Sequence, residues 1–303
     1  MTGTNNGSSP GGTATLARRE VARMGFGAMQ LPGPGVFGPP RDRDTAIAVL
    51  RRAVALGVNH IDTAQFYGPD VANELIHAAL HPYPEGLVLV SKVGAARDDQ
   101  GAFTPAQRPE QLRAGVEANL RTLAAERVDV VNLRLLEAAP DGSQLPDDQH
   151  VDLDSQLAEM VALRDEGKIG GIGMSTITAD QLRQALPSGI ACVQNPYSVL
   201  DRSGEPVLDL CREHDIAWVP YFPLGSAFPG IPKVTEHPAV VAAATARDAT
   251  PAQVGLAWLL AHDPHVLLIP GTSSVAHLED NIAAADVHLD PETMSTLDDL
   301  ASA

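Results

Sequence analysis

Residues 154–175 read DSQLAEMVALRDEGKIGGIGMS and contain one complete unit of the pattern that decides the fold. Apolar side chains recur every three or four positions over residues 154–165, which predicts an amphipathic helix. Gly167 then stands where a helix typically ends. The apolar run over residues 169–175 is continuous rather than alternating, as expected for a parallel strand covered on both faces.

The same unit recurs along the whole chain. Continuous apolar runs predict strands over residues 21–27, 58–62, 87–92, 128–133, 169–175, 190–194, 216–221 and 266–270. Helices are predicted over residues 45–56, 107–123 and 154–165, and after the capping signals at Thr178, Thr250 and Asp290. About eight strand–helix units without a linker predict an α/β fold, a (β/α)8 TIM barrel, as a single domain.

The barrel domain is predicted over residues 14–303, after a disordered tail over residues 1–13 that is rich in Gly, Ser, Asn and Thr. The length of 303 residues leaves two domains, or an open doubly wound sheet, as alternatives, since such a barrel typically has ~250 residues. An open dinucleotide-binding sheet is disfavoured, because Gln30 stands where the motif G-x-G-x-x-G, begun by Gly25 and Gly27, requires its third glycine.

Composition limits the classes of partner. The chain has 21 Lys and Arg against 38 Asp and Glu, a net charge of -17, which argues against nucleic-acid and membrane partners. Cys192 and Cys211 are too few for a disulfide framework or a zinc site, and the N-terminal residues do not resemble a secretion signal. We therefore expect a cytoplasmic protein, a monomer or weak homo-oligomer, that acts on a small molecule and holds no metal.

Polar, aromatic or glycine residues stand at the carboxyl ends of seven predicted strands, where barrel enzymes carry their active sites. These residues are Asp62, Lys92, Arg134, Ser175, Gln194, Tyr221 and Gly271. Because the strands are parallel, we expect all seven to meet at one end of the barrel and to form a site.

Asp62, Lys92 and the nearby Tyr67 form a chemically meaningful group. A lysine ammonium beside a phenol favours the phenolate and so makes the tyrosine a better acid, while an aspartate holds the lysine charged. Such a tyrosine donates a proton to a carbonyl oxygen. The alternative is a purely structural Asp62–Lys92 ion pair with a surface tyrosine.

Six motifs in this order resemble those of the aldo-keto reductase family. They occupy residues 25–31, 61–64 with 67–68, 91–92, 172–175, 193–198 and 269–273. Within the family, residues 33–43 and 129–134 are most similar to the bacterial pyridoxal reductase branch. The resemblance covers the chain beyond its tail, and it implies a (β/α)8 barrel that uses NADPH to reduce an aldehyde, with pyridoxal reduced to pyridoxine.

The resemblance also implies roles for the catalytic residues. Tyr67 would be the proton donor, Lys92 would lower its pKa, and Asp62 would pair with Lys92. The family's histidine falls on Arg134, which stays charged and so cannot relay a proton. Arg134 can instead stabilise negative charge on the substrate oxygen; the alternative is an ion pair with Glu137.

The NADPH site implied by the resemblance draws on many segments. Tyr221 would stack on the nicotinamide, and Ser175 and Gln194 would hold its carboxamide, with Thr176 where the family has asparagine. Residues 271–273 would bind the 2′-phosphate, although Gly271 and His277 replace the usual lysine and arginine. The full implied set is Gly27, Ala28, Met29, Asp62, Ser175, Thr176, Gln194, Tyr221, Phe222, Pro223, Leu224, Gly225, Ser226, Gly271, Thr272, Ser273, His277, Asp280 and Asn281.

Two alternatives to a pyridoxal reductase stay open at this point. One is a broad-specificity aldehyde and ketone reductase, in which Arg134 has no special role. The other is an NADP(H)-binding module that reports on redox state with little turnover. Asp62, Tyr67 and Lys92 favour an enzyme.

Overall fold

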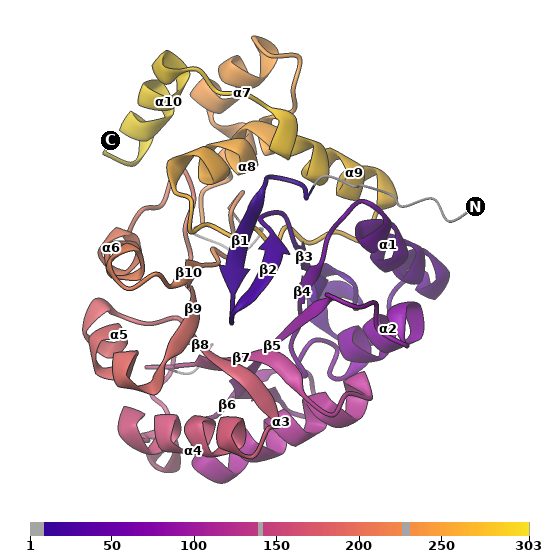
Figure 1. Ribbon diagram of the computed structural model, residues 1–303, viewed down its shortest axis with the longest axis vertical. Coiled ribbons are helices and arrows are strands. Elements are labelled where there is room, and N and C mark those ends of the chain that lie inside the picture. Colours follow the sequence, from indigo (N-terminus) through magenta and orange to yellow (C-terminus); the bar gives the residue numbers. More distant parts are fainter. Residues whose placement is uncertain (1–8, 139–141, 226–230, 303) are drawn as a thin grey trace.

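A closed ring of parallel strands surrounded by helices forms the core of the protein (Figure 1). The structure, a computed structural model, describes residues 9–138, 142–225 and 231–302. Its parallel strands are β3 (Phe26–Gly27), β4 (His60–Asp62), β5 (Val88–Arg97), β7 (Val128–Arg134), β8 (Ile169–Ser175), β9 (Ile190–Gln194) and β10 (Ala217–Trp218). They neighbour one another in the order β10-β9-β8-β7-β5-β4-β3.

The ring is closed by residues 266–268, which lie between β10 and the segment before β3. Val266 forms a parallel bridge with Trp218, and Leu268 forms one with Met24. The predicted strand over residues 266–270 is therefore reduced to isolated bridges, yet it occupies the place of the eighth strand. The predicted (β/α)8 barrel is confirmed.

The helices lie outside the ring, and their buried apolar side chains belong to one hydrophobic core. They are α1 (Arg43–Ala55), α2 (Val71–Leu80), α3 (Pro109–Leu123), α4 (Leu153–Asp165), α5 (Ala179–Ala185), α6 (Glu205–Glu213), α7 (Pro238–Thr245), α8 (Pro251–His262), α9 (Val275–Ala283) and α10 (Pro291–Asp298). Both predicted capping boxes are present, at Thr178 with Gln181 and at Thr250 with Gln253. No described helix is long and apolar enough to cross a membrane.

The start of the chain differs from the prediction. The run over residues 21–27 is split, because β2 (Arg19–Ala22) pairs antiparallel with β1 (Thr13–Leu16) instead of joining the barrel. Ala17 and Arg18 both have positive φ, the geometry of a tight two-residue hairpin turn. Of the tail predicted over residues 1–13, residues 1–8 lie outside the described residues, whereas residues 9–12 form a turn that leads into β1.

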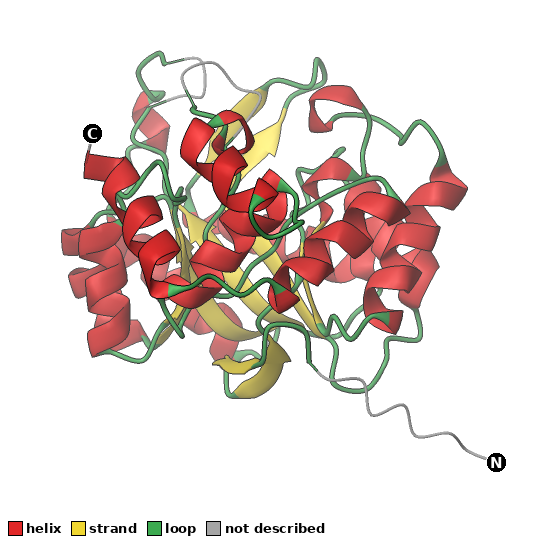
Figure 2. Cartoon of the chain, turned by 90° about the horizontal axis from the view of Figure 1, so that it is seen from above, coloured by secondary structure: helices red, strands yellow, loops and turns green. Residues whose placement is uncertain are grey.

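The β1–β2 hairpin covers the end of the barrel where the strands begin (Figure 2). Leu16 and Val21 pack with Val88 and Val130 inside the barrel. At the rim, Arg19 forms an ion pair with Asp129 at 2.8 Å. This end of the barrel is therefore filled with apolar side chains, which leaves the carboxyl ends of the strands for chemistry.

His60 lies on β4 inside the barrel and is 1% exposed. A Cβ atom at Gly25 would lie 2.1 Å from its Nε2 atom, so only glycine fits against the ring. Burial lowers the pKa of His60 to about 4. His60 is therefore neutral in the folded protein at neutral pH.

His60 should make folding stability fall as pH falls from 7 to 4. In the unfolded chain a histidine takes up its proton near pH ~6.5, whereas the folded protein takes it up only near pH 4. In that interval the unfolded state binds more protons, so the free energy of unfolding drops by up to about 3 kcal/mol.

Urea unfolding at pH 7 and pH 4.5 measures this effect. His60→Gln should show a smaller loss of stability between the two pH values than the native protein. The exposed His214 provides a matched control, because His214→Gln should keep the native pH dependence. Equal losses in the native protein and in His60→Gln would contradict the prediction.

Candidate active site

A cavity of ≈ 620 Å³ opens at the carboxyl ends of the strands. All seven strand-end residues predicted from the sequence line it, together with Tyr67. They meet there because parallel neighbours keep a regular register, in which Gly27 lies beside Asp62 and Arg134 beside Ser175. The prediction that these residues share one rim of the barrel therefore agrees with their positions.

Lys92 lies buried between Asp62 and Tyr67 at the bottom of the cavity. Its Nζ atom donates hydrogen bonds to Oδ1 of Asp62 and to the carbonyl oxygen of Thr63, the latter at 3.0 Å. It also lies 5.0 Å from the centre of the Tyr67 ring. Burial by itself lowers the pKa of Lys92, but attraction to Asp62 and Tyr67 and hydrogen bonds to both hold it above its ordinary value. The lysine is therefore a permanent cation beside a phenol.

Gln194 connects this group to the next strands. Its Nε2 atom donates to Oδ2 of Asp62 at 2.6 Å, so that Asp62 accepts hydrogen bonds on both of its carboxylate oxygens. The Oε1 atom of Gln194 is buried and has no hydrogen-bond partner among the described residues. Nearby, the hydroxyl groups of Thr176 and Tyr221 lie 3.3 Å apart. The Gln194 side chain thus lines the cavity with one amide atom bonded to Asp62 and the other buried without a partner.

Arg134 ends β7 and is half-buried at the cavity wall. Its Nε atom has no partner, and it makes no ion pair with Glu137 or any other described residue. Asn132, two residues earlier, is fully buried, and its Nδ2 atom donates to the carbonyl oxygen of Ser91 at 3.3 Å. Asn132 therefore supports the strands, whereas Arg134 offers a free guanidinium to the cavity.

The residues expected to hold a dinucleotide mostly line the same cavity. Those that do are Gly27, Met29, Asp62, Ser175, Gln194, Tyr221, Phe222, Pro223, Leu224, Gly225, Gly271, Thr272, His277, Asp280 and Asn281. Three expected residues do not line this cavity. Ala28 is fully buried, and Ser273 lines an adjoining cavity. The Thr176 hydroxyl lies 3.3 Å from that of Tyr221, which does line it. Ser226 lies outside the described residues.

Comparisons with known proteins identify the family of the chain. The model of the aldo/keto reductase family matches residues 23–302. The chain belongs to this family. It is 44% identical over 290 residues to pyridoxine 4-dehydrogenase of Escherichia coli (strain K12), covering 95% of this chain and 98% of that protein.

Two further similar proteins match nearly the whole chain. An uncharacterized oxidoreductase of Schizosaccharomyces pombe is 34% identical, over 96% of this chain and 90% of that protein. A crystal structure of an aldo/keto reductase from Klebsiella pneumoniae, in complex with NADP and acetate, superposes with a TM-score of 0.77 at 26% identity. That superposition covers 95% of each chain.

Several residues of this aldo/keto reductase site were missed by sequence reasoning. Gln30, Thr250, Ala252, Ile269 and Pro270 also line the cavity. Gln30, Ile269 and Pro270 lie inside the family motifs over residues 25–31 and 269–273 but were not assigned to the site. Thr250 was noticed only as a helix cap, and Ala252 lies two residues after it.

Arg97 is a further residue that the sequence did not reveal. β5 continues past Lys92 to Arg97 and pairs with β6 (Phe103–Ala106), forming a hairpin above the cavity. The Arg97 guanidinium donates to the carbonyl oxygens of Phe66, Gly101 and Gly35 at 3.3, 2.6 and 3.2 Å. It also stacks 3.8 Å from the centre of the Phe103 ring. Arg97 thus joins three loops around Tyr67.

A buried polar network supports Asp62 and Lys92 from behind. Thr63, next to Asp62, donates to Oδ1 of Asn73 at 2.8 Å. Asn73 donates to Oδ1 of Asn119 at 2.9 Å, and Ser91, next to Lys92, donates to the same oxygen at 2.5 Å. α2 and α3 are thereby connected to the two strands that carry the ion pair.

Asn119→Ala should lower the free energy of unfolding by about 2–4 kcal/mol, because Asn73 and Ser91 both lose a buried acceptor. Urea unfolding measures this loss. Gln184→Ala, which removes an exposed amide on α5, serves as the control and should change stability by no more than ~0.5 kcal/mol. A loss of the same small size in Asn119→Ala would show that the network adds no stability.

Proposed function

We propose that this chain is an NADPH-dependent reductase that converts an aldehyde to an alcohol, with pyridoxal as its substrate. The observation that carries the proposal is the buried Lys92 ammonium between the Asp62 carboxylate and the Tyr67 phenol, at the bottom of an open cavity. The relation to pyridoxine 4-dehydrogenase at 44% identity supports the choice of substrate.

The chemistry of the cavity fits a nicotinamide dinucleotide. Gln194 and Ser175 both line the cavity, and their amide and hydroxyl groups are of the kind that pair with a carboxamide. The Tyr221 ring lines the wall between them and the loop over residues 222–225, where it would stack on a flat ring. When bound, NADPH supplies the hydride that reduces the carbonyl carbon of the aldehyde.

Tyr67 supplies the proton in the proposed reaction. The aldehyde oxygen would accept a hydrogen bond from the phenol, whose O–H bond breaks as the carbonyl carbon gains a hydride. The product is an alcohol, and the phenolate left behind is stabilised by the neighbouring Lys92 ammonium. Asp62 and Gln194 hold that ammonium in place, because Asp62 accepts a hydrogen bond from it and Gln194 donates one to the other oxygen of the Asp62 carboxylate.

Arg134 would bind the substrate at the same point. Its guanidinium lines the cavity with Tyr67 and Lys92 and is not neutralised by a described carboxylate. Pyridoxal has a phenolic oxygen beside its aldehyde group, and a planar guanidinium can bind two adjacent oxygens at once. The same contact stabilises negative charge that develops on the carbonyl oxygen.

The setting of the activity is also part of the proposal. Cys192 and Cys211 are free and buried, which supports a reducing compartment such as the cytoplasm.

Tyr67→Phe should lower kcat for pyridoxal by roughly 10²–10⁴-fold, because it removes the proton donor. The affinity for NADPH should stay close to the native value, since the phenol would contact the substrate and not the phosphates. Stopped-flow kinetics and a fluorescence titration with NADPH on the same preparation measure both quantities. A variant that keeps about a tenth of the native kcat would exclude Tyr67 as the acid.

Pyridoxal should be preferred over butanal and 4-nitrobenzaldehyde in kcat/KM, and Arg134 should be the source of that preference. Arg134→Ala should reduce kcat/KM for pyridoxal by roughly 10²-fold or more, and Arg134→His should lose less because it keeps a hydrogen-bond donor. In both variants the ratio of pyridoxal to butanal should fall. An unchanged ratio would contradict this prediction and favour a broad-specificity reductase. If the native protein reduced no aldehyde at all, the alternative of an NADP(H)-binding module would be favoured.

A further inference from the structure

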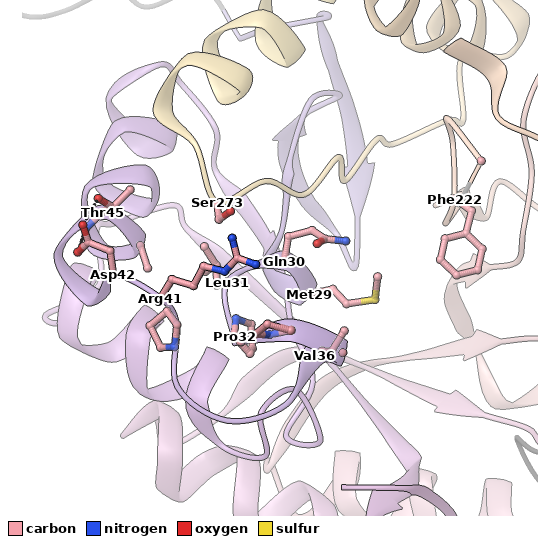
Figure 3. Close-up of a pocket in the computed structure, with 16 residues that line it drawn as sticks. Met29, Gln30, Leu31, Pro32, Val36, Arg41, Asp42, Thr45, Phe222 and Ser273 are labelled. Carbon is pink, nitrogen blue, oxygen red and sulfur yellow. Dashed lines mark hydrogen bonds between the residues drawn. The ribbon is translucent and has the colours of Figure 1, made fainter. Parts of the chain in front are cut away.

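A second cavity of ≈ 710 Å³ adjoins the proposed active site. Met29, Gln30, Phe222 and Gly225 line both cavities, so the two are continuous. The second cavity extends away from the chemical centre, toward the loop before α1 and the segment before α9. Figure 3 shows Arg41 reaching from that loop toward Ser273 and Gln30.

Arg41 is exposed and forms no hydrogen bond or ion pair with a described residue. Its neighbour Asp42 does not neutralise it, because that carboxylate caps α1. Asp42 accepts hydrogen bonds from the backbone N–H groups of Asp44 and Thr45 at 3.0 and 3.1 Å, and from the Thr45 hydroxyl at 2.8 Å. The Arg41 guanidinium is therefore open to a ligand in the cavity.

Cations are scarce along this path. In the two cavities, the described lysine and arginine residues are Lys92, Arg134 and Arg41. Lys92 is engaged by Asp62, and Arg134 lies with it at the chemical end. Residues 226–230, which are not described, read SAFPG and add no charge. The chain has a net charge of -17. Among the described residues that line the second cavity, the Arg41 guanidinium is the one cation that a ligand phosphate could contact there.

We propose that Arg41, together with the Ser273 hydroxyl, binds the 2′-phosphate of NADPH and so sets the preference for NADPH over NADH. The inference rests on the proposed function, because it assumes that the dinucleotide occupies the first cavity. Ser273 lies just before the Ser274 cap of α9, and His277, Asp280 and Asn281 on that helix line the first cavity. A phosphate beside Ser273 can thus meet a guanidinium from the opposite wall, and a guanidinium binds a phosphate through two parallel hydrogen bonds.

Fluorescence titrations with NADPH and with NADH test this assignment by binding alone. Arg41→Gln should weaken NADPH binding by about tenfold or more and leave NADH binding close to native, since NADH lacks the 2′-phosphate. Arg41→Lys should recover part of the affinity, because it restores the charge without the planar fork. Arg43→Gln is the matched control, since Arg43 is exposed two residues away and does not line the cavity; it should change neither affinity.

Equal weakening of NADPH and NADH would overturn the inference, because the contact would then be to the pyrophosphate that both share. Unchanged binding of both would overturn it as well. Either result leaves the proposed function intact as long as the native protein binds NADPH and reduces pyridoxal. Failure of the native protein to bind either dinucleotide would instead refute the proposed function itself.

Discussion

The buried ion pair between Lys92 and Asp62 is the constraint on which the rest of the site depends. Both side chains are nearly inaccessible, at 5% and 3% exposed, and a buried charge without its partner costs about 3–5 kcal/mol. The surrounding residues satisfy this demand, with the Thr63 carbonyl on the ammonium and the Gln194 amide on the carboxylate. Tyr67 then lies beside a cation that cannot move away.

That constraint extends outward to the helices and loops. Asn73 and Asn119 have polar side chains, yet both are fully buried in the layer between the helices and the sheet. They are tolerated there because each bonds to another buried polar group, and together they reach the strands on both sides of the ion pair. On the opposite side, Arg97 holds the loops against the aromatic ring next to Tyr67. The buried asparagine network and the Arg97 contacts therefore hold the site in place from opposite sides.

Local patterns predicted the barrel and its chemical rim, because strand-end residues follow directly from a repeated strand–helix unit. Contacts between distant segments were not predictable in the same way. Arg97 was missed because β5 was expected to end at Lys92, and its three acceptors lie on loops without periodic pattern. The β1–β2 hairpin was missed because Val21 packs inside the barrel and is therefore apolar. In the sequence alone, its apolar run resembles a strand of the ring.

The short closure of the ring has a consequence for dynamics. Between Trp218 and Met24, the barrel is joined by isolated bridges and a few backbone hydrogen bonds, those of Leu267 and Leu268 among them. This seam is where we expect the cylinder to open first in amide hydrogen exchange, because few bonds must break there. The same segment runs on into residues 271–273 at the dinucleotide cavity. A ligand bound at residues 271–273 would stabilise this closure of the ring. Ligand binding would therefore stabilise the closed barrel as a whole.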